Sequence, residues 1–184
     1  IKKFMIEKNV YHKLNDYIKA SGDLAVKLYK EDIEAALRTK DFGGFELLSL
    51  SDYTGQSTAT VGILDVFYES KGLISHDEFK NFAGEAVPLF KAKRIFKNTD
   101  TLEAELDLYD FGEKKINNPV YNLTVQNGKQ VFYKRSTTES KVSIPLNSIT
   151  KSTMLSVILE VNGYKNTWRI FVFAENKIEN NVRM

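Results

Sequence analysis

The first half of the chain carries the helical period. Apolar side chains recur three and four positions apart over residues 10–18 and again over residues 24–37. The pattern weakens at Gly22, and Asp23 is a suitable N-cap for the segment that follows. Gly43 and its neighbours stop the pattern, because glycine tolerates the left-handed conformation in which many helices end. We therefore predict two helices before Gly43, separated near Gly22.

A short apolar segment comes next. Residues 45–52, with the sequence FELLSLSD, lie between glycines on one side and a Thr-Gly turn on the other. An apolar run of this length between turn signals is typical of a buried strand in a parallel sheet. Ser75 and Glu78 then form a capping box and predict a further helix that ends near Gly84. The order helix, strand, loop, helix is a fragment of alternating α/β architecture.

The second half alternates with a period of two residues. In Thr101–Asp110, apolar residues alternate with mostly acidic ones, which is typical of a strand with one solvated face. Similar runs occupy residues 94–96, 120–126, 130–135, 141–146, 154–161 and 167–174. Asn127-Gly128 and Asn162-Gly163 are predicted hairpin turns. About seven short strands at regular spacing predict an antiparallel β-sandwich of immunoglobulin-like kind.

Together these patterns predict an α+β chain with two domains, residues 1–88 and residues 89–184. The charge distribution changes with the periodicity. Residues 1–90 hold 11 basic and 14 acidic side chains, whereas residues 91–184 hold 15 and 10. The basic residues of the second half are scattered along predicted strands rather than clustered, so we do not expect nucleic-acid binding.

Composition excludes several kinds of site. The 184 residues include no cysteine, which excludes disulfides, thiolate metal centres and cysteine nucleophiles. The two histidines, His12 and His76, are too few for a histidine metal site, and we expect both on solvated surfaces. We predict no metal and no cofactor. No uncharged stretch has the length of a membrane helix, so no membrane partner is expected. The chain opens at Ile1 without a signal-like stretch, and we expect a processed or excised piece.

Asp52 is the leading candidate for chemistry. If residues 45–52 form a strand, Asp52 lies at its carboxyl end, where α/β barrels and open α/β sheets place their sites. The loop that follows is rich in Thr, Ser and Gln, which suit hydrogen bonds to sugar hydroxyls. An equally physical alternative is that Asp52 caps the loop and the hydroxyls bond their own backbone. Glu46 and Asp52 would be about 20 Å apart on a strand, which excludes them as a glycosidase pair needing about 5 to 9.5 Å.

Aromatic residues of the second half allow two interpretations. Five of them would form a platform for stacking sugars if they faced solvent, namely Phe132, Tyr133, Trp168, Phe171 and Phe173. Aromatic side chains also favour strands and fill sandwich cores, which makes them packing residues.

Three segments of the chain resemble one family. The run GGFELLSLSDYTGQSTATVGILDVFYESKGLISHDEF resembles the last strand, loop and helix of the (β/α)8 catalytic domain in glycoside hydrolase family 2-like proteins. These are the β-galactosidase and β-glucuronidase relatives common in gut Bacteroidetes. SGDLAVKLYKEDIEAALRT resembles the preceding helix, and NTWRIFVFAE resembles the Asn-x-Trp closing strand of the C-terminal β-sandwich. The resemblance covers residues 10–175 and is most specific over residues 43–72.

The resemblance implies a C-terminal fragment, namely one barrel-end unit followed by a sandwich. The family uses two glutamates at the ends of the fourth and seventh barrel strands, and this chain starts after both, so it has no catalytic residues of its own. In the parent protein Asp52, Tyr53 and Gln56 would line the sugar site. The resemblance further implies a carbohydrate partner, a periplasmic or extracellular location and a strand open to self-association. The alternative is a free-standing carbohydrate-binding or protein-interaction β-sandwich module.

Overall fold

The computed structural model describes residues 1–55 and 60–175. The chain divides into two compact units, Ile1–Ala83 and Gly84–Met184, which we call the N-terminal unit and the β domain. The fold is α+β, with antiparallel and mixed sheets, and no barrel closes among the residues described. The predicted boundary after residue 88 falls inside a strand, so the division lies a few residues earlier in the chain.

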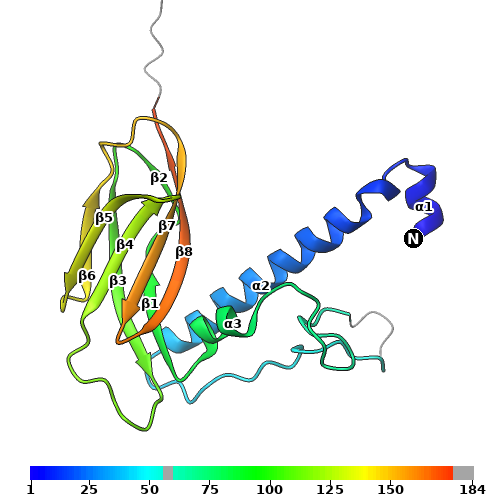
Figure 1. The fold of residues 1–184 in the computed structure, drawn as a ribbon, viewed down its shortest axis with the longest axis horizontal. Helices are drawn as coiled ribbons and strands as arrows, with labels where there is room; N and C mark the ends of the chain where they lie inside the picture. The colour runs from blue at the N-terminus through cyan, green and yellow to red at the C-terminus, as the bar shows by residue number, and fades with distance from the viewer. Residues whose placement is uncertain (56–59, 176–184) are drawn as a thin grey trace, which may run out of the picture. The chain divides into compact units, whose positions relative to one another are not determined.

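The N-terminal unit consists of helices and a long irregular segment (Figure 1). Its helices are α1 (Lys2–Glu7), the 3-10 turn η1 (Tyr11–Lys13), α2 (Leu14–Arg38) and α3 (His76–Ala83). The capping box of α3 is confirmed, because Ser75 N donates to Glu78 Oε2 at 3.0 Å and Glu78 N donates to Ser75 Oγ at 3.2 Å.

The predicted break near Gly22 is wrong, because α2 runs through it without interruption. A Cβ at Gly22 would lie 2.4 Å from Leu73 Cδ2, so the glycine lets the Leu73 side chain lie directly against the helix. Asp23 is not a cap; its carboxylate accepts a hydrogen bond from Lys19 Nζ at 2.9 Å within the same helix. The glycine therefore marks a close contact and not a helix end. The predicted end before Gly43 is confirmed.

The predicted strand over residues 45–52 is wrong. The segment has no strand; it contains a turn and one isolated parallel bridge, from Ser51 to Leu64. Leu48 is 93% exposed and Phe45 is 42% exposed, so the apolar run is not buried. A strand in a parallel sheet needs hydrogen-bonded neighbours and cover on both faces. The described part of this unit supplies neither beyond the one bridge.

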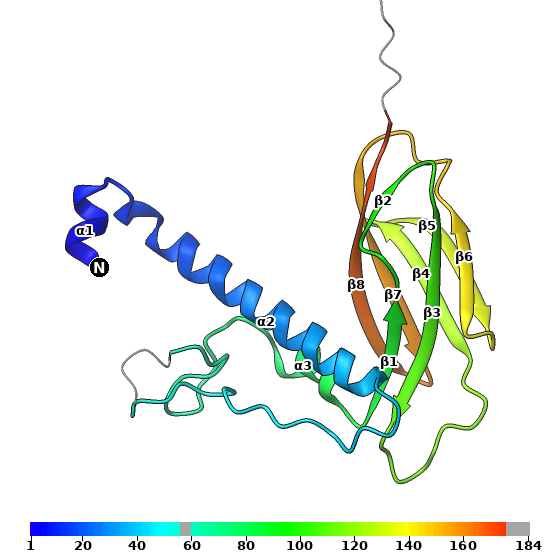
Figure 2. The same ribbon diagram turned by 180° about the vertical axis from the view of Figure 1, so that it is seen from behind.

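The β domain contains two sheets that share one hydrophobic core (Figures 1 and 2). The three-stranded sheet has the order β1-β3-β6 and the five-stranded sheet the order β2-β8-β7-β4-β5. The strands are β1 (Ala86–Lys91), β2 (Ile95–Lys97), β3 (Thr101–Asp110), β4 (Tyr121–Asn127), β5 (Gln130–Thr137), β6 (Lys141–Pro145), β7 (Thr153–Val161) and β8 (Tyr164–Phe173). All pairs are antiparallel except β2 with β8.

The predicted strands of this domain are confirmed, with β1 as the one addition. The Asn162-Gly163 turn is also confirmed: both residues have positive φ, 50° and 87°, which is the conformation of a type I′ hairpin. Gly128, at φ 57°, makes the turn between β4 and β5. The sequence pattern does not predict β1, because five of its six residues are buried. Both faces of the strand are covered, so no alternation of apolar and polar residues marks it.

The Asn-x-Trp segment connects the two sheets inside the core. Asn166, 1% exposed, donates from Nδ2 to the Pro88 carbonyl oxygen at 3.0 Å. Two residues further along β8, the Trp168 ring lies 5.3 Å from the Phe90 ring, centroid to centroid. Trp168 is 4% exposed and belongs to the core.

Candidate functional site

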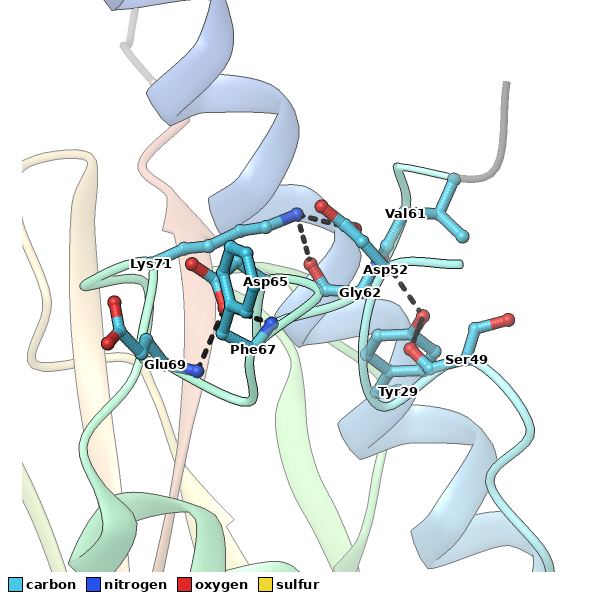
Figure 3. A network of polar contacts seen from close by, with 9 residues as sticks. All are labelled: Tyr29, Ser49, Asp52, Val61, Gly62, Asp65, Phe67, Glu69 and Lys71. Atoms are coloured by element: carbon cyan, nitrogen blue, oxygen red, sulfur yellow. Dashed lines mark hydrogen bonds and ion pairs between the residues drawn. The ribbon is translucent and has the colours of Figure 1, made fainter. Parts of the chain in front are cut away.

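Asp52 lies at the centre of a polar network in the N-terminal unit (Figure 3). Its Oδ1 accepts hydrogen bonds from the Gly62 backbone N–H at 2.9 Å and from Lys71 Nζ at 2.7 Å. Lys71 Nζ also donates to the Gly62 carbonyl oxygen at 2.9 Å. One lysine therefore joins Asp52 to the backbone ten residues further along the chain.

The backbone at this point is too crowded for any side chain at residue 62. A Cβ at Gly62 would lie 2.4 Å from the Ser51 carbonyl carbon and 2.5 Å from the Asp52 nitrogen. The two segments are held by backbone hydrogen bonds in both directions, from Asp52 N to Leu64 O and from Leu64 N to Leu50 O, each at 3.1 Å. Glycine at position 62 is thus a condition for the Asp52 contact.

The contacts of Asp52 decide its charge. The hydrogen bond from Lys71 lowers the pKa of the Asp52 carboxyl, the Gly62 N–H lowers it further, and desolvation opposes both. The side chain is 10% exposed and that of Lys71 is 27% exposed. Asp52 is therefore an ionised hydrogen-bond acceptor at neutral pH, which is unsuited to the role of general acid.

Two further residues fix the same loop. Asp65 Oδ1 accepts from the backbone N–H groups of Phe67, at 2.8 Å, and Glu69, at 2.9 Å, and so closes a tight turn. The Tyr29 hydroxyl of α2 lies 3.2 Å from the Ser49 carbonyl oxygen and 3.3 Å from that of Val61. Its single proton can be donated to one of these oxygens at a time. Tyr29 thus links α2 to the loop through one of these two carbonyl oxygens at a time.

The structure describes two of the three predicted sugar-site residues. Asp52 is enclosed by its own loop, as in the capping alternative, whereas Tyr53 is 63% exposed and its ring lies over Gly55. Gln56 lies outside the described residues. Among the described residues, Asp52 Oδ2 accepts no hydrogen bond, so one carboxylate oxygen stays available to a ligand. Lys71, Gly62 and Tyr29 were not predicted, because no motif marks contacts between positions this far apart.

A second charged cluster in this unit is structural. The Glu34 side chain is buried on α2 and forms ion pairs with Lys30 and with Arg38, whose Nη1 lies 3.3 Å from Oε2. Lys30 Nζ also lies 5.3 Å from the centre of the Phe82 ring. Paired cations on both sides are what a buried carboxylate requires. The cluster joins α2 to α3 and leaves no group for chemistry.

The described residues contain neither a cluster of metal-ligating side chains nor a membrane-spanning helix. No three His, Asp or Glu side chains gather in a way that could hold a metal ion. No helix in residues 1–55 and 60–175 is long and apolar enough to cross a membrane.

The aromatic side chains of the β domain fall into two groups. Trp168 is in the core, and Phe132 and Tyr133 are partly buried against it, so these three are packing residues. Phe171 and Phe173 face outward from β8 and are 42% and 54% exposed.

One family model matches part of the β domain. Residues 100–174 match the family model described as Domain of unknown function (DUF8488), which covers less than half of the chain. No curated protein matches. Among solved structures, three N-terminal domains of the outer capsid protein Hoc of bacteriophage RB49 are similar at 10% identity, with a TM-score of 0.35 over 49% of this chain and 30% of that one.

The sulfur carrier protein SoxY of Chlorobium limicola f thiosulfatophilum is similar at 11% identity, with a TM-score of 0.28 over 48% of this chain and 79% of that one. The match to the Hoc structure spans under a third of that structure's length. Similarities at this level carry no functional conclusion.

Proposed function

We propose that this chain is the C-terminal, non-catalytic part of a glycoside hydrolase family 2-like protein. The parent hydrolyses O-glycosidic bonds with two glutamates that lie outside this chain. The N-terminal unit completes the end of the parent's (β/α)8 barrel, and the β domain, an immunoglobulin-like sandwich, braces it. The proposal rests on the resemblance of residues 43–72 to that barrel end, and it includes a periplasmic or extracellular location for the parent.

The observation that carries the proposal is the uncovered apolar surface of α2. Tyr17, Leu24 and Leu28 are 50%, 55% and 55% exposed, and their spacing of seven and four residues places them along one side of the helix. Only the last part of α2 is buried, at Ile33 and Leu37. A helix with an apolar stripe in solvent is typical of one that packs against further protein.

The loop region of the same unit also exposes large apolar side chains. Leu48 is 93% exposed, and Phe67 and Tyr68 are 79% and 71% exposed, although the backbone around them is held by Asp52 and Asp65. An ordered loop that presents large apolar side chains to water is suited to a contact surface. A barrel of parallel strands would provide both the cover and the missing strand neighbours of residues 45–52.

In this proposal Asp52 orients a sugar hydroxyl and transfers no proton. Lys71 and Gly62 hold one carboxylate oxygen, which leaves Oδ2 to accept a hydrogen bond from the substrate. Tyr53 and Gln56 add a ring and an amide to the same wall. The lowered pKa of Asp52 keeps the acceptor ionised at neutral pH.

Hydrolysis of aryl glycosides by the isolated chain tests the division of labour. We expect no hydrolysis above the rate in buffer alone, because the proposal places both catalytic glutamates in another part of the parent protein. Asp52-dependent hydrolysis, abolished by Asp52→Asn, would contradict the proposal. The coding sequence upstream of Ile1 provides the second arm: it should encode two glutamates at the ends of barrel strands.

The burial of Trp168 weakens the alternative of a free-standing carbohydrate-binding module that stacks sugars on this ring. Trp168 is 4% exposed and cannot stack on a sugar without unfolding the core. Phe171 and Phe173 are the exposed aromatic side chains of β8, and they lie on the outward face of the five-stranded sheet.

A further inference from the structure

The outward face of the five-stranded sheet has an apolar row at one end. Strand pairing aligns Ile95 of β2, Phe171 of β8 and Met154 of β7 side by side. They are 66%, 42% and 42% exposed, and Phe173 extends the row along β8 with 54% exposure. Neighbours on one face of a sheet lie about 5 Å apart across strands. The row is thus a continuous apolar strip of the kind that marks a binding surface.

A polar row lies next to it. Arg169 of β8 pairs with Ser156 of β7, which pairs with Gln126 of β4, and Val131 of β5 ends the row. Arg169 is one alternation from Phe171 on the same strand, so the two side chains are about 7 Å apart along it. Among the described residues, the Arg169 side chain has no hydrogen-bond or ion-pair partner. Its guanidinium therefore keeps its full set of donors for a ligand.

The third row adds hydroxyls and a second cation. Thr167, Ile158, Thr124 and Lys134 lie side by side on strands β8, β7, β4 and β5. Among the described strand residues of this face, the only carboxylate is Glu160, beyond the third row. The opposite sheet differs: β3 presents Glu103, Glu105 and Asp107 on its outward side. The outward side of β3 is thus acidic, with Lys91 of β1 and Lys141 of β6 beside it, whereas the face of the five-stranded sheet has more cations than carboxylates.

From this arrangement we infer that the outward face of the five-stranded sheet binds an anionic polysaccharide. The apolar row suits the C–H faces of sugar rings, the Ser, Thr and Gln side chains suit their hydroxyls, and Arg169 is positioned to bind a carboxylate or sulfate through two parallel hydrogen bonds. Lys134 adds charge at the far edge. The choice of a polysaccharide over an acidic protein rests on the proposed function, whereas the cationic and apolar character of the face does not.

A nucleic acid fits the surface less well. Duplex DNA carries one charge per about 1.7 Å of helix axis, and proteins that bind it neutralise many phosphates at once. Among the described strand residues, this face offers three cations with no side-chain hydrogen bond or ion pair, Arg169, Lys134 and Lys165, and Lys165 lies opposite Glu160 on β7. It also offers several uncharged hydrogen-bonding groups between them. A few cations among several hydroxyl and amide groups suit a polymer that carries one anion and several hydroxyls on each sugar.

Calorimetric titration of the full chain with oligogalacturonate tests the inference, with heparin as the sulfated arm. We expect binding that weakens with salt. Arg169→Gln should weaken it about tenfold, as expected for one charge-assisted pair, and Phe171→Ala should weaken it by a similar factor. Arg169→Lys should restore only part of the affinity, because lysine lacks the planar fork.

Matched controls are available on other surfaces. Lys141→Gln removes an exposed cation from β6 of the opposite sheet, and Phe67→Ala removes an exposed ring from the N-terminal unit; both should bind like the unaltered chain. Absence of binding, equal losses from Arg169→Gln and Lys141→Gln, equal affinity for neutral dextran, or tighter binding of single-stranded DNA would each overturn the inference. None of these results bears on whether the parent hydrolyses glycosides, so the two proposals fail separately.

Discussion

Asn166 and Pro88 join the two sheets of the β domain through one buried hydrogen bond. Asn166 Nδ2 lies 3.0 Å from the Pro88 carbonyl oxygen, and its Oδ1 accepts from the Thr167 N–H at 2.8 Å. Pro88 has no N–H, and its carbonyl lies on β1, an edge strand of the three-stranded sheet. The asparagine therefore satisfies a backbone acceptor that no neighbouring strand reaches, which explains the first position of the Asn-x-Trp segment.

Asn166→Ala should destabilise the β domain by about 1–3 kcal/mol, because the buried Pro88 carbonyl and the partly buried Thr167 N–H would lose their partners. Asn166→Asp should also destabilise it, since a carboxylate cannot donate to a carbonyl. Urea unfolding provides the measurement. Asn117→Ala, at an exposed position, is the control and should change the unfolding free energy little. Equal stability of the Asn166→Ala and Asn117→Ala variants would disprove the role of this bond.

Trp168→Ala should cost about 3–5 kcal/mol, as expected for removal of a buried tryptophan that packs on Phe90. Trp168→Phe should cost less, because most of the volume is kept. Phe171→Ala, on the outward side of the same strand, should change stability by less than about 0.5 kcal/mol. Circular dichroism during denaturation follows all three variants. A stable Trp168→Ala variant would place the ring outside the core.

Lys71 should control the titration of Asp52. The folded-state pKa of Asp52 is lowered, so its interactions stabilise the fold above the unfolded pKa of about 3.9 and are lost as pH falls through the lower, folded value. Carbon-detected NMR of the Asp52 carboxyl should report a value below that of an exposed aspartate, and Lys71→Met should move it back upward.

Asp110 is the internal control for that titration. Its pKa is lowered by the backbone N–H groups of Ile116 and Gly112 in the β domain, so Lys71→Met should leave it unchanged. If Asp52 titrates identically with and without Lys71, the ion pair does not form in solution.

Ser75→Ala should shorten or fray α3. The variant removes the hydroxyl that accepts from Glu78 N, at a cost of about 1 kcal/mol. It should also raise the pKa of Glu78, which hydrogen bonds from Ser75 now lower. Hydrogen exchange of residues 76–83 measures the fraying, and Ser75→Asp, which keeps an N-cap acceptor, should retain most of the protection. Unchanged exchange in Ser75→Ala would mean that the capping box adds nothing to α3.

How much the sequence predicts depends on whether one face of an element meets water. The strands from β2 to β8 have polar outward positions, so their period of two residues is visible, and Thr101–Asp110 matches its predicted bounds. β1 is buried on both faces and has no such period. Residues 45–52 have the composition of a buried strand, but composition carries no information on whether neighbouring strands are present.

The candidate site divides in the same way. Asp52 was found because it follows an apolar run, and the alternative in which it caps its own loop describes its contact with the Gly62 N–H. Lys71 and Tyr29 were missed because they approach the loop from positions 19 and 20 residues away from their partners. Contacts of that range follow from the path of the backbone and not from any local pattern.

Steady-state hydrolysis of an aryl glycoside by the parent protein, compared with its Asp52→Asn variant, tests the central proposal most directly. We expect turnover by the parent and a KM raised about tenfold or more by Asp52→Asn. The pH profile of kcat should be unchanged, because Asp52 orients a hydroxyl and transfers no proton. A parent without turnover, or one whose KM ignores Asp52, would contradict it.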